Sequence, residues 1–424
     1  MTFWSIVADD LTGALDTALQ FQKRRWLCVV STRPGIWPTP KRDASAIALT
    51  TETRHLDATQ AEIRTRAAIR DTWAEKHDES TGLYKKTDSL LRGNIAVEIK
   101  AMLDVVGNRS IVFSPAYPDG GRTTIDGVHH IDGRPVTEAF AGIDRVTPAR
   151  ESHIPTLLTA NTTLTVRHVP LRIVRGRNEE LTAAFVAAQQ AHIDVIVPDA
   201  ASNEDLQSIT RSMNHASMTQ ICAGAAGLAQ HLASNNKTSD ILEGTNRTAS
   251  VAAIVGTPNR HTRDQITQAI RQIDAKLVPA QRTIGLAAAM GLARKAWRNG
   301  KPVIFDAVLP SPPIASAELT DQLDLIQNLG SDLKAETADL NFILTGGDTA
   351  QAALQGLGVE ALEIAGEIDW GVPVGRACGS SCNGVSIVTK GGTMGGSTSL
   401  VKAFQRLGHY PFLDNMSIGA PHGS

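Results

Sequence analysis

The 424-residue sequence is poor in cysteine and aromatic residues and carries almost no net charge. Four cysteines scattered along so long a chain favour structural thiols in a reducing compartment over a disulfide framework or a zinc site. Aromatic residues make up 4% of the chain and its formal net charge is -2, so we expect binding to neither nucleic acid nor anionic membranes. The sequence starts without a secretory signal and has no apolar run that could cross a bilayer. These absences favour a cytoplasmic protein.

Short apolar runs alternate with longer segments of helical periodicity. The runs are continuous and rich in β-branched residues, which is typical of parallel strands covered on both faces. The pattern predicts an α/β protein of two domains, each with a largely parallel sheet flanked by helices. Expected strands include 3–8, 46–50, 110–114, 194–199, 219–224, 251–256, 302–307, 341–346 and 385–390, and expected helices include 57–76, 94–106, 203–215, 261–273, 285–299 and 348–357.

A polar segment rich in asparagine and threonine divides the chain. It spans residues 235–250 and follows a segment with the pattern of a helix that would end the first domain. Such a composition is typical of a linker between domains. We therefore place one domain at residues 1–234 and a second at residues 251–424.

The segment 118–140 breaks the alternation of strands and helices. Asp-Gly pairs at 126–127 and 132–133 flank a short strand pattern, which predicts an antiparallel hairpin excursion. His129 and His130 lie between these turns. Neighbouring residues of a strand point to opposite faces, so we expect solvated hairpin residues rather than ligands of one metal ion.

Two adjacent aspartates follow the first expected strand directly, in the stretch IVADDLTGALDTA. Carboxylates at the end of a strand lose hydration unless a partner or ligand compensates them. Asp10 or Thr12 can cap the next helix. The turn has more acceptors than a cap needs, so we also predict that Asp9 and Asp10 bind a hydroxyl-rich ligand or a hydrated cation.

The stretch YKKTDSLLRGNIAVEI, residues 84–99, forms a dense polar cluster after another strand. Its lysine and arginine side chains can hold a carboxylate, and its aspartate and serine can hold hydroxyl groups. Arg54 also follows a strand, and Arg122 belongs to a loop made rigid by prolines and glycines. These features predict a site for an acidic polyol, and a solvated loop of mutually neutralising charges is the alternative.

Three strand–loop–helix turns in the C-terminal domain are typical of phosphate binding. FILTGGDTAQAAL and IVTKGGTMGGSTSLVKAF place glycines before a helix, whose N-terminus favours an anion, and VGTPNRHTRDQI has small and hydroxyl residues there. Ser397 stands where a Walker A loop needs lysine, and the dinucleotide fingerprint is missing. Asp348 would repel a phosphate unless magnesium lies between them or its side chain caps the helix. We predict a nucleotide-phosphate site outside both motif classes.

Taken in order with TETRHL and SPAYPDGGRTTIDGVHHIDGRPV, these motifs resemble the four-carbon acid sugar kinase family over nearly the whole chain. The resemblance implies that the N-terminal domain holds the acid sugar and the C-terminal domain holds ATP. Asn259 and Met394 depart from the family, where serine and an aromatic residue are common. The implied substrate-binding residues are Asp9, Asp10, Arg54, Lys86, Thr87, Asp88, Ser89, Arg92 and Arg122, and the implied nucleotide-binding residues are Thr257, Gly346, Gly347, Asp348, Thr349, Gly391 and Gly392.

The same resemblance implies a reaction. ATP, with Mg²⁺, would phosphorylate the 4-hydroxyl of D-threonate, or of D-erythronate or a 3-oxo-tetronate. Asp9 and Asp88 are the candidate catalytic residues, Asp348 is an alternative base, and no residue is assigned to magnesium. A non-catalytic two-domain acid-sugar-binding protein is the alternative from another class, and a dehydrogenase is a further one. The sequence does not determine the oligomeric state; a homodimer is one candidate, because two-fold dimers are the commonest soluble assembly.

Overall fold

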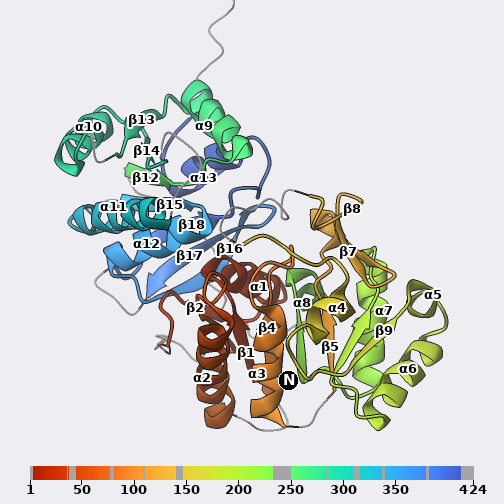
Figure 1. Cartoon of the computed structure of the whole chain (residues 1–424). Helices are drawn as coiled ribbons and strands as arrows, with labels where there is room; N and C mark the ends of the chain where they lie inside the picture. Colours follow the sequence, from red (N-terminus) through yellow and green to blue (C-terminus); the bar gives the residue numbers. More distant parts are fainter. Residues whose placement is uncertain are drawn as a thin grey trace, which may run out of the picture. The chain divides into compact units, whose positions relative to one another are not determined.

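The computed structural model describes residues 3–35, 37, 44–76, 81–107, 110–139, 147–232, 250–281, 284–308, 316–336, 340–378 and 382–411. The chain forms two compact units, Met1–Leu242 and Glu243–Ser424 (Figure 1). The predicted linker, apart from its last residue, lies outside the described residues. The domain limits at residues 234 and 251 therefore stay a prediction.

The first unit is built on a parallel sheet, in the order β2-β3-β1-β4-β11-β5-β10-β9. Its strands are continuous runs of buried residues, as expected for a sheet covered on both faces. They are β1 Phe3–Ala8, β2 Cys28–Ser31, β3 Ala46–Thr50, β4 Thr81–Lys86, β5 Ile111–Ser114, β9 Val166–Val169, β10 Val195–Pro198 and β11 Ile221–Gly224.

Helices cover this sheet on both faces because successive side chains of a strand point in opposite directions. Trp4 of β1 packs edge-on against Phe21 of α1, with ring centroids 5.2 Å apart. Val7 of the same strand belongs to the core beneath α2 and α3. The helices are α1 Leu11–Lys23, α2 Ala58–Lys76, α3 Ile95–Val106, α4 Ile154–Thr159, α5 Leu171–Val174, α6 Asn178–Gln190, α7 Asn203–His215 and α8 Ala226–Leu232.

The predicted antiparallel excursion is present. After the short 3₁₀ helix Pro118–Gly120, strands β6 Arg122–Ile125, β7 Val128–Ile131 and β8 Arg134–Pro135 form a separate antiparallel sheet. The expectation of solvated histidines is wrong for His129, whose exposed fraction is 0%. Its ring nitrogens lie within hydrogen-bond distance of Thr124 Oγ1, at 3.0 Å, and of the Ser89 carbonyl oxygen, at 2.9 Å.

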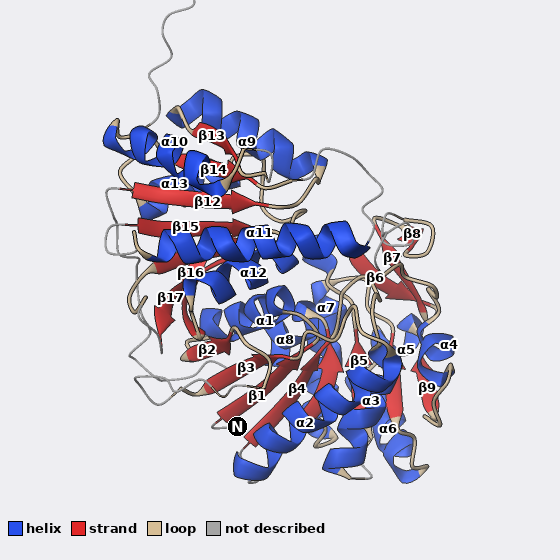
Figure 2. Cartoon of the chain, turned by 60° about the vertical axis from the view of Figure 1, so that its left-hand side comes forward, coloured by secondary structure: helices blue, strands red, loops and turns tan. Residues whose placement is uncertain are grey.

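The second unit has a mixed sheet in the order β13-β14-β12-β15-β18-β17-β16. The first five strands run parallel, and β12 and β15 lie side by side (Figure 2). β16 and β17 are antiparallel to their neighbours, and the sequence reading missed both. The strands are β12 Ser250–Val255, β13 Lys276–Pro279, β14 Val303–Asp306, β15 Leu340–Thr345, β16 Ala361–Asp369, β17 Val372–Cys378 and β18 Ser386–Lys390.

Helices also cover the second sheet. α9 and α13 pack into one apolar core with β12 and β15. α11 and α12 approach so closely that a Cβ built on Gly356 would lie 2.0 Å from the Gln327 carbonyl oxygen, so this position needs glycine. The helices are α9 Arg260–Ile273, α10 Leu286–Arg298, α11 Ser316–Lys334, α12 Gly347–Leu357 and α13 Ser399–Leu407. Within the described ranges, none of the helices combines the length and apolar character of a bilayer span.

The two sheets share one winding pattern. In each unit the chain starts on an inner strand and forms its next strand two positions away on one side. The third strand fills the position between these two, and the fourth lies on the other side of the first. The inner strands are β1 and β12, and the fourth strands are β4 and β15. Ligands of open α/β sheets bind where the winding direction reverses, at the carboxyl ends of the strands. This confirms the predicted α/β class and directs attention to the ends of β1 and β12.

Candidate functional site

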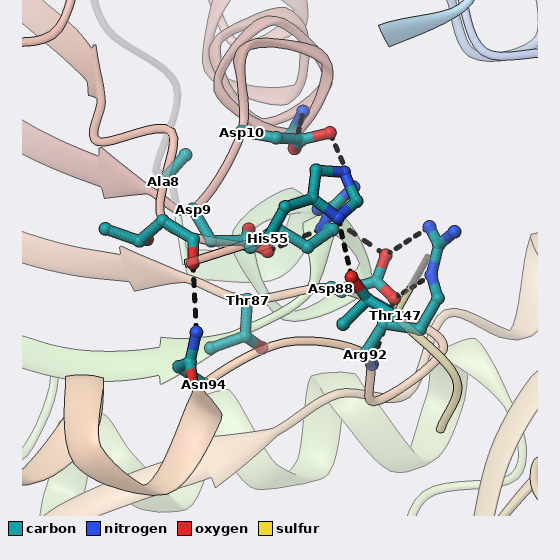
Figure 3. A network of polar contacts seen from close by, with 12 residues as sticks. Ala8, Asp9, Asp10, His55, Thr87, Asp88, Arg92, Asn94 and Thr147 are labelled. Carbon is teal, nitrogen blue, oxygen red and sulfur yellow. Dashed lines mark hydrogen bonds and ion pairs between the residues drawn. The ribbon is translucent and has the colours of Figure 1, made fainter. Parts of the chain in front are cut away.

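At the end of β1, one guanidinium group gathers three carboxylates. Arg54 follows β3 and donates from Nε to Asp9 Oδ2 at 2.8 Å and from Nη1 to Asp10 Oδ2 at 2.6 Å. Its Nη2 lies 3.6 Å from Asp88 Oδ1, in the loop after β4. The three strands are neighbours in the sheet, so their loops meet at one edge (Figure 3). The sequence prediction that these four residues lie together is therefore met by the geometry.

The cluster keeps Asp9 ionised. Burial disfavours the charged form of Asp9, but Arg54, Lys85 and Lys86 together hold the pKa of this carboxyl below its usual range. Burial likewise disfavours the charged guanidinium of Arg54, and the surrounding carboxylates raise its pKa well above the usual value. Asp9 is 2% exposed, and its Oδ1 has no hydrogen-bond partner among the described residues. A buried, charged oxygen without a partner is a strong acceptor for a ligand hydroxyl.

Asp10 has a second task. Its Oδ1 accepts a hydrogen bond from the Gly13 amide at 2.8 Å, so it is the N-cap of α1. A Cβ on Gly13 would lie 2.7 Å from this oxygen and 3.0 Å from Lys86 Nζ. The absence of a side chain at Gly13 therefore lets the cap and the lysine approach the helix. The capping prediction for Asp10 is therefore confirmed, its other oxygen accepts from Arg54, and ligand binding by Asp10 stays a prediction.

Asp88 is held by Arg92. The Arg92 side chain donates to both carboxylate oxygens, at 2.7 Å to Oδ2 and 3.1 Å to Oδ1 (Figure 3). Burial of Asp88 opposes ionisation, yet Arg92 and Arg54 lower its pKa far below the usual range. A carboxylate so strongly stabilised in its charged form is a weak proton acceptor at neutral pH.

Two cations of the predicted site have no carboxylate partner among the described residues. Lys86 is 4% exposed and donates to the Thr87 carbonyl oxygen at 2.8 Å. Arg122 is 8% exposed, donates to the Gly120 carbonyl oxygen, and has a buried Nε without a partner in the described ranges. Burial lowers the pKa of Arg122, and Asp88 is the first of the acids that oppose this effect. Lys86 and Arg122 are the better candidates for an anionic ligand, because Arg54 is already occupied by its own acids.

Sequence reasoning missed an ion pair beneath the cluster. Lys85 Nζ lies 2.8 Å from Glu98 Oε2, and both side chains are almost completely buried. Glu98 also accepts from Thr53 Oγ1 at 2.6 Å, one residue before Arg54. The signal was present, since Glu98 lies three residues after Ile95 and one before Ile99, on the apolar face of α3.

Glu52 is a second missed residue. Its backbone has φ 48°, in the left-handed region that a residue other than glycine rarely adopts. This turn brings its Oε1 to 2.9 Å from the Leu11 amide, the first of α1. Backbone strain of this kind persists where the surrounding structure requires it. Here it places an acid against the positive end of α1, beside Asp9 and Asp10.

The hairpin is tied to the loop that carries Asp88. His129 bonds to the Ser89 backbone, as described above, and burial lowers the pKa of His129 to about 4, so the ring is neutral at pH 7. The hairpin turn is held in its place by Asp199, which is completely buried at the end of β10. Asp199 accepts from the amides of Asp126 and Gly127 at 2.9 Å each. Buried contacts thus link β10, the hairpin and the predicted substrate loop.

In the second unit, three loops converge where β12, β15 and β18 end. A Cβ on Gly392 would lie 2.9 Å from Thr257 Oγ1, and one on Gly346 would lie 3.5 Å from Thr257 Cβ. Gly346 has φ 108°, which favours glycine, and is the N-cap of α12. Thr349 is buried, and its Oγ1 would lie 3.0 Å from that Gly346 Cβ. The loops leave a lining of glycines and hydroxyl groups at a helix N-terminus, which fits the phosphates of a nucleotide.

Asp369, the last residue of β16, holds the glycine-rich loop 391–398 by hydrogen bonds at its C-terminal end. This carboxylate accepts from the Gly396 amide at 3.1 Å, from the Ser399 hydroxyl, and from Lys402 Nζ at 3.1 Å. Partial burial opposes ionisation, but these donors lower the pKa of Asp369 to about 2. The loop therefore has a defined path before α13. Asp348 is exposed in the first turn of α12, and in the described part of the chain no group of three or more His, Cys, Asp or Glu residues is arranged to hold a metal ion.

Residues 4–232 match the family described as a sugar-binding N-terminal domain, and residues 252–400 match the family described as a nucleotide-binding C-terminal domain. A D-threonate kinase of Bordetella bronchiseptica is 32% identical over 413 residues, which cover 95% of this chain and 96% of that protein. The chain belongs to the four-carbon acid sugar kinase family. It is accordingly an enzyme, a kinase.

Other members of the four-carbon acid sugar kinase family match over similar lengths. A D-threonate kinase of Salmonella typhimurium is 28% identical, with 94% of this chain and 96% of that protein covered. A D-erythronate kinase of Heliobacterium modesticaldum is 24% identical, with 92% and 94% covered. A crystal structure from Salmonella typhimurium LT2 has a TM-score of 0.78 at 22% identity and covers 96% of this chain and 100% of that one. This likeness supports the fold.

Proposed function

We propose that this kinase transfers the γ-phosphoryl group of ATP to the 4-hydroxyl of D-threonate and forms 4-phospho-D-threonate. Two of the relatives above carry the name D-threonate kinase, which supports this substrate. D-erythronate and 3-oxo-tetronates are the alternative substrates, since other family members are named for them. These acids share a four-carbon chain and a carboxylate and differ at the hydroxyl-bearing carbons.

The observation that carries the proposal is the unpartnered oxygen of Asp9 beside cations that have no acid partner in the described ranges. In this assignment Asp9 binds and orients the hydroxyl groups of the sugar acid, and Lys86 and Arg122 hold its carboxylate. Asp10 and Arg54 keep Asp9 in place, and Thr87 offers a buried hydroxyl without a partner among the described residues. Ser89 and Arg92 complete the predicted set.

Asp9 and Asp88 keep separate roles in this proposal. Asp9 is the better catalytic candidate, because it has an oxygen available to a substrate hydroxyl. The lowered pKa of Asp88 and its two bonds to Arg92 favour a role in orienting the loop over a role as a base. Phosphoryl transfer depends mainly on alignment and charge neutralisation, so the available oxygen of Asp9 matters more than its basicity.

We assign the nucleotide to the loops of the second unit. Backbone amides of Gly347, Gly391 and Gly392 would bind its phosphates, with the hydroxyl groups of Thr257 and Thr349 beside them. The Gly346 amide already donates to the Lys390 carbonyl oxygen, so Gly346 would contribute the close approach of its backbone, which has no side chain in the way. Magnesium would neutralise charge on the phosphates, and Asp348 is the acid of these loops that could approach it. The cytoplasmic location and the homodimer also stay predictions.

A coupled assay of ADP release over a panel of four-carbon acids tests the proposal. D-threonate should give the highest kcat/KM, and D-erythronate, L-threonate and 3-oxo-tetronates should give lower values. A preference for D-erythronate would transfer the assignment to the alternative substrate. Absence of ATP-dependent turnover with every acid of the panel would refute the proposed substrate class.

A further inference from the structure

One buried cation of the second unit is not used by the assignment above. Lys390 is the last residue of β18 and is 2% exposed. Its Nζ donates to the Gly391 carbonyl oxygen at 3.0 Å and lies 3.4 Å from Thr262 Oγ1. Thr262 in turn donates to the Gly392 carbonyl oxygen at 2.9 Å. The ammonium group therefore lies directly beneath the Gly391-Gly392 turn.

The charge of Lys390 is uncompensated within the protein as described. Among the described residues, no carboxylate lies within 4.0 Å of its Nζ. Lys85, the comparable buried lysine of the first unit, has Glu98 at 2.8 Å. Burial lowers the pKa of Lys390 to about 8, with no acid opposing the effect. An unpaired buried charge destabilises the free protein.

The position of Lys390 relates it to the phosphate loops. It is the register partner of Thr345 in the neighbouring strand β15, and the Gly346 amide donates to its carbonyl oxygen at 2.9 Å. Gly392, two residues later, faces Thr257. The ammonium group is thus placed at the base of two of the converging loops, where a bound polyphosphate would be its nearest anion.

We propose that Lys390 is a positioning residue for the nucleotide, which sets the Gly391-Gly392 turn and supplies the countercharge for the phosphates above it. The inference rests on the proposed nucleotide site. It explains why the chain keeps an unpaired charge in its core, since the charge is compensated when the anion binds. The same lysine stabilises the complex and destabilises the free enzyme.

This dual role predicts effects of opposite sign in one variant. Lys390→Met keeps the length of the side chain and removes the charge. The melting temperature of the nucleotide-free enzyme should rise or stay the same, because the cost of burying the ammonium is gone. The affinity for ATP should fall at least about tenfold, because a hydrogen-bonding charge typically contributes more than about 1.4 kcal/mol. A purely structural residue would lower both quantities together.

The experiment measures Kd for ATP, ADP and AMP with the full-length enzyme, by calorimetry or by competition, together with the melting temperature without nucleotide. The variants are Lys390→Met, Lys390→Gln and, as a control, Lys276→Met, which changes an exposed lysine of β13 in the same unit. The loss of affinity in both Lys390 variants should decrease from ATP through ADP to AMP, as the number of phosphate charges falls. The control should bind like wild type.

Two results would overturn the inference. Wild-type affinity for ATP in Lys390→Met would show that the charge is irrelevant to the nucleotide. A lower melting temperature with equal losses for ATP, ADP and AMP in both variants would assign the lysine a structural role. Failure of the wild-type enzyme to bind ATP at all is a separate result, which would overturn the nucleotide site itself and this inference with it.

Discussion

Replacement of Asp9 by asparagine tests the substrate site most directly. The change keeps the shape of the side chain and removes its charge, so Arg54 would donate to an uncharged amide oxygen instead of a carboxylate oxygen. A charge-assisted hydrogen bond contributes about 1.5–3 kcal/mol and a neutral one about 0.5–1.5 kcal/mol. The lower burial penalty of the amide offsets part of this difference. We expect the free energy of unfolding to fall by about 1 kcal/mol, which leaves the enzyme folded.

The effect on turnover should be much larger. Asp9 has the one carboxylate oxygen of this aspartate pair that is buried and without a partner in the described residues, so its charge is available to the substrate. Loss of a group that orients or deprotonates the reacting hydroxyl typically lowers the rate about 10²–10⁴-fold. Measurement of kcat by coupled ADP release, with the Kd for ADP from calorimetry, should show a rate loss in this range and an unchanged nucleotide affinity.

Asp10→Asn is the matched control. Asparagine is as good an N-cap as aspartate, so the bond to the Gly13 amide is kept and only the charge facing Arg54 is lost. The stability change should equal that of Asp9→Asn, and kcat should fall less than tenfold. Similar rates for the two variants, or a rate for Asp9→Asn within threefold of wild type, would remove Asp9 from the mechanism.

Three further predictions concern other parts of the enzyme. Arg54→Met leaves three buried or half-buried carboxylates without their common partner, so urea unfolding should show a loss of about 3–5 kcal/mol; a loss below about 1 kcal/mol would contradict the cluster. A Cβ on Gly392 would lie 2.9 Å from Thr257 Oγ1, so Gly392→Val should disturb the loop and raise the Kd for ATP at least about tenfold. The kcat/KM for the sugar acid is measured in parallel. Unchanged ATP binding would contradict the assignment of this loop to the phosphates. The pKa of His129 is lowered to about 4 from an unfolded value near 6.5, so the unfolded chain binds more protons in this window and stability falls as the pH drops from 6.5 towards 4. His129→Gln should remove about 2 kcal/mol of this pH dependence in urea titrations at pH 7 and 5, and an unchanged slope would refute the assignment.

The sequence predicted most of the fold because its signals are local. Continuous apolar runs and helical periodicity depend on neighbouring residues, and Asp-Gly turns mark the hairpin directly. The approach of Asp9, Arg54 and Asp88 could also be predicted, since each follows a strand and parallel strands end at one edge. The antiparallel pair β16 and β17 was missed, because its alternating pattern is weak beside the stronger periodicity of the helices.

The partners of the supporting residues could not be found in this way. The place of Glu98 on the apolar face of α3 indicates that it is buried, but its partner Lys85 is identified only when the strands pair. The segment around His129 has the composition of a turn. His129 becomes buried only because the hairpin packs against Asp199 and the loop that carries Ser89. Their positions depend on contacts between residues far apart in the sequence, which periodicity does not report.

His129 bonds to the main-chain carbonyl oxygen of Ser89, in the predicted substrate loop. The Ser89 side chain therefore takes no part in this bond. If Ser89 contacts the sugar acid, as predicted, replacing its hydroxymethyl group with a larger or smaller one would alter the chemistry presented to the ligand and spare the anchorage of the loop. Preference among stereoisomeric acids could then change at this residue without loss of the contacts that hold the loop.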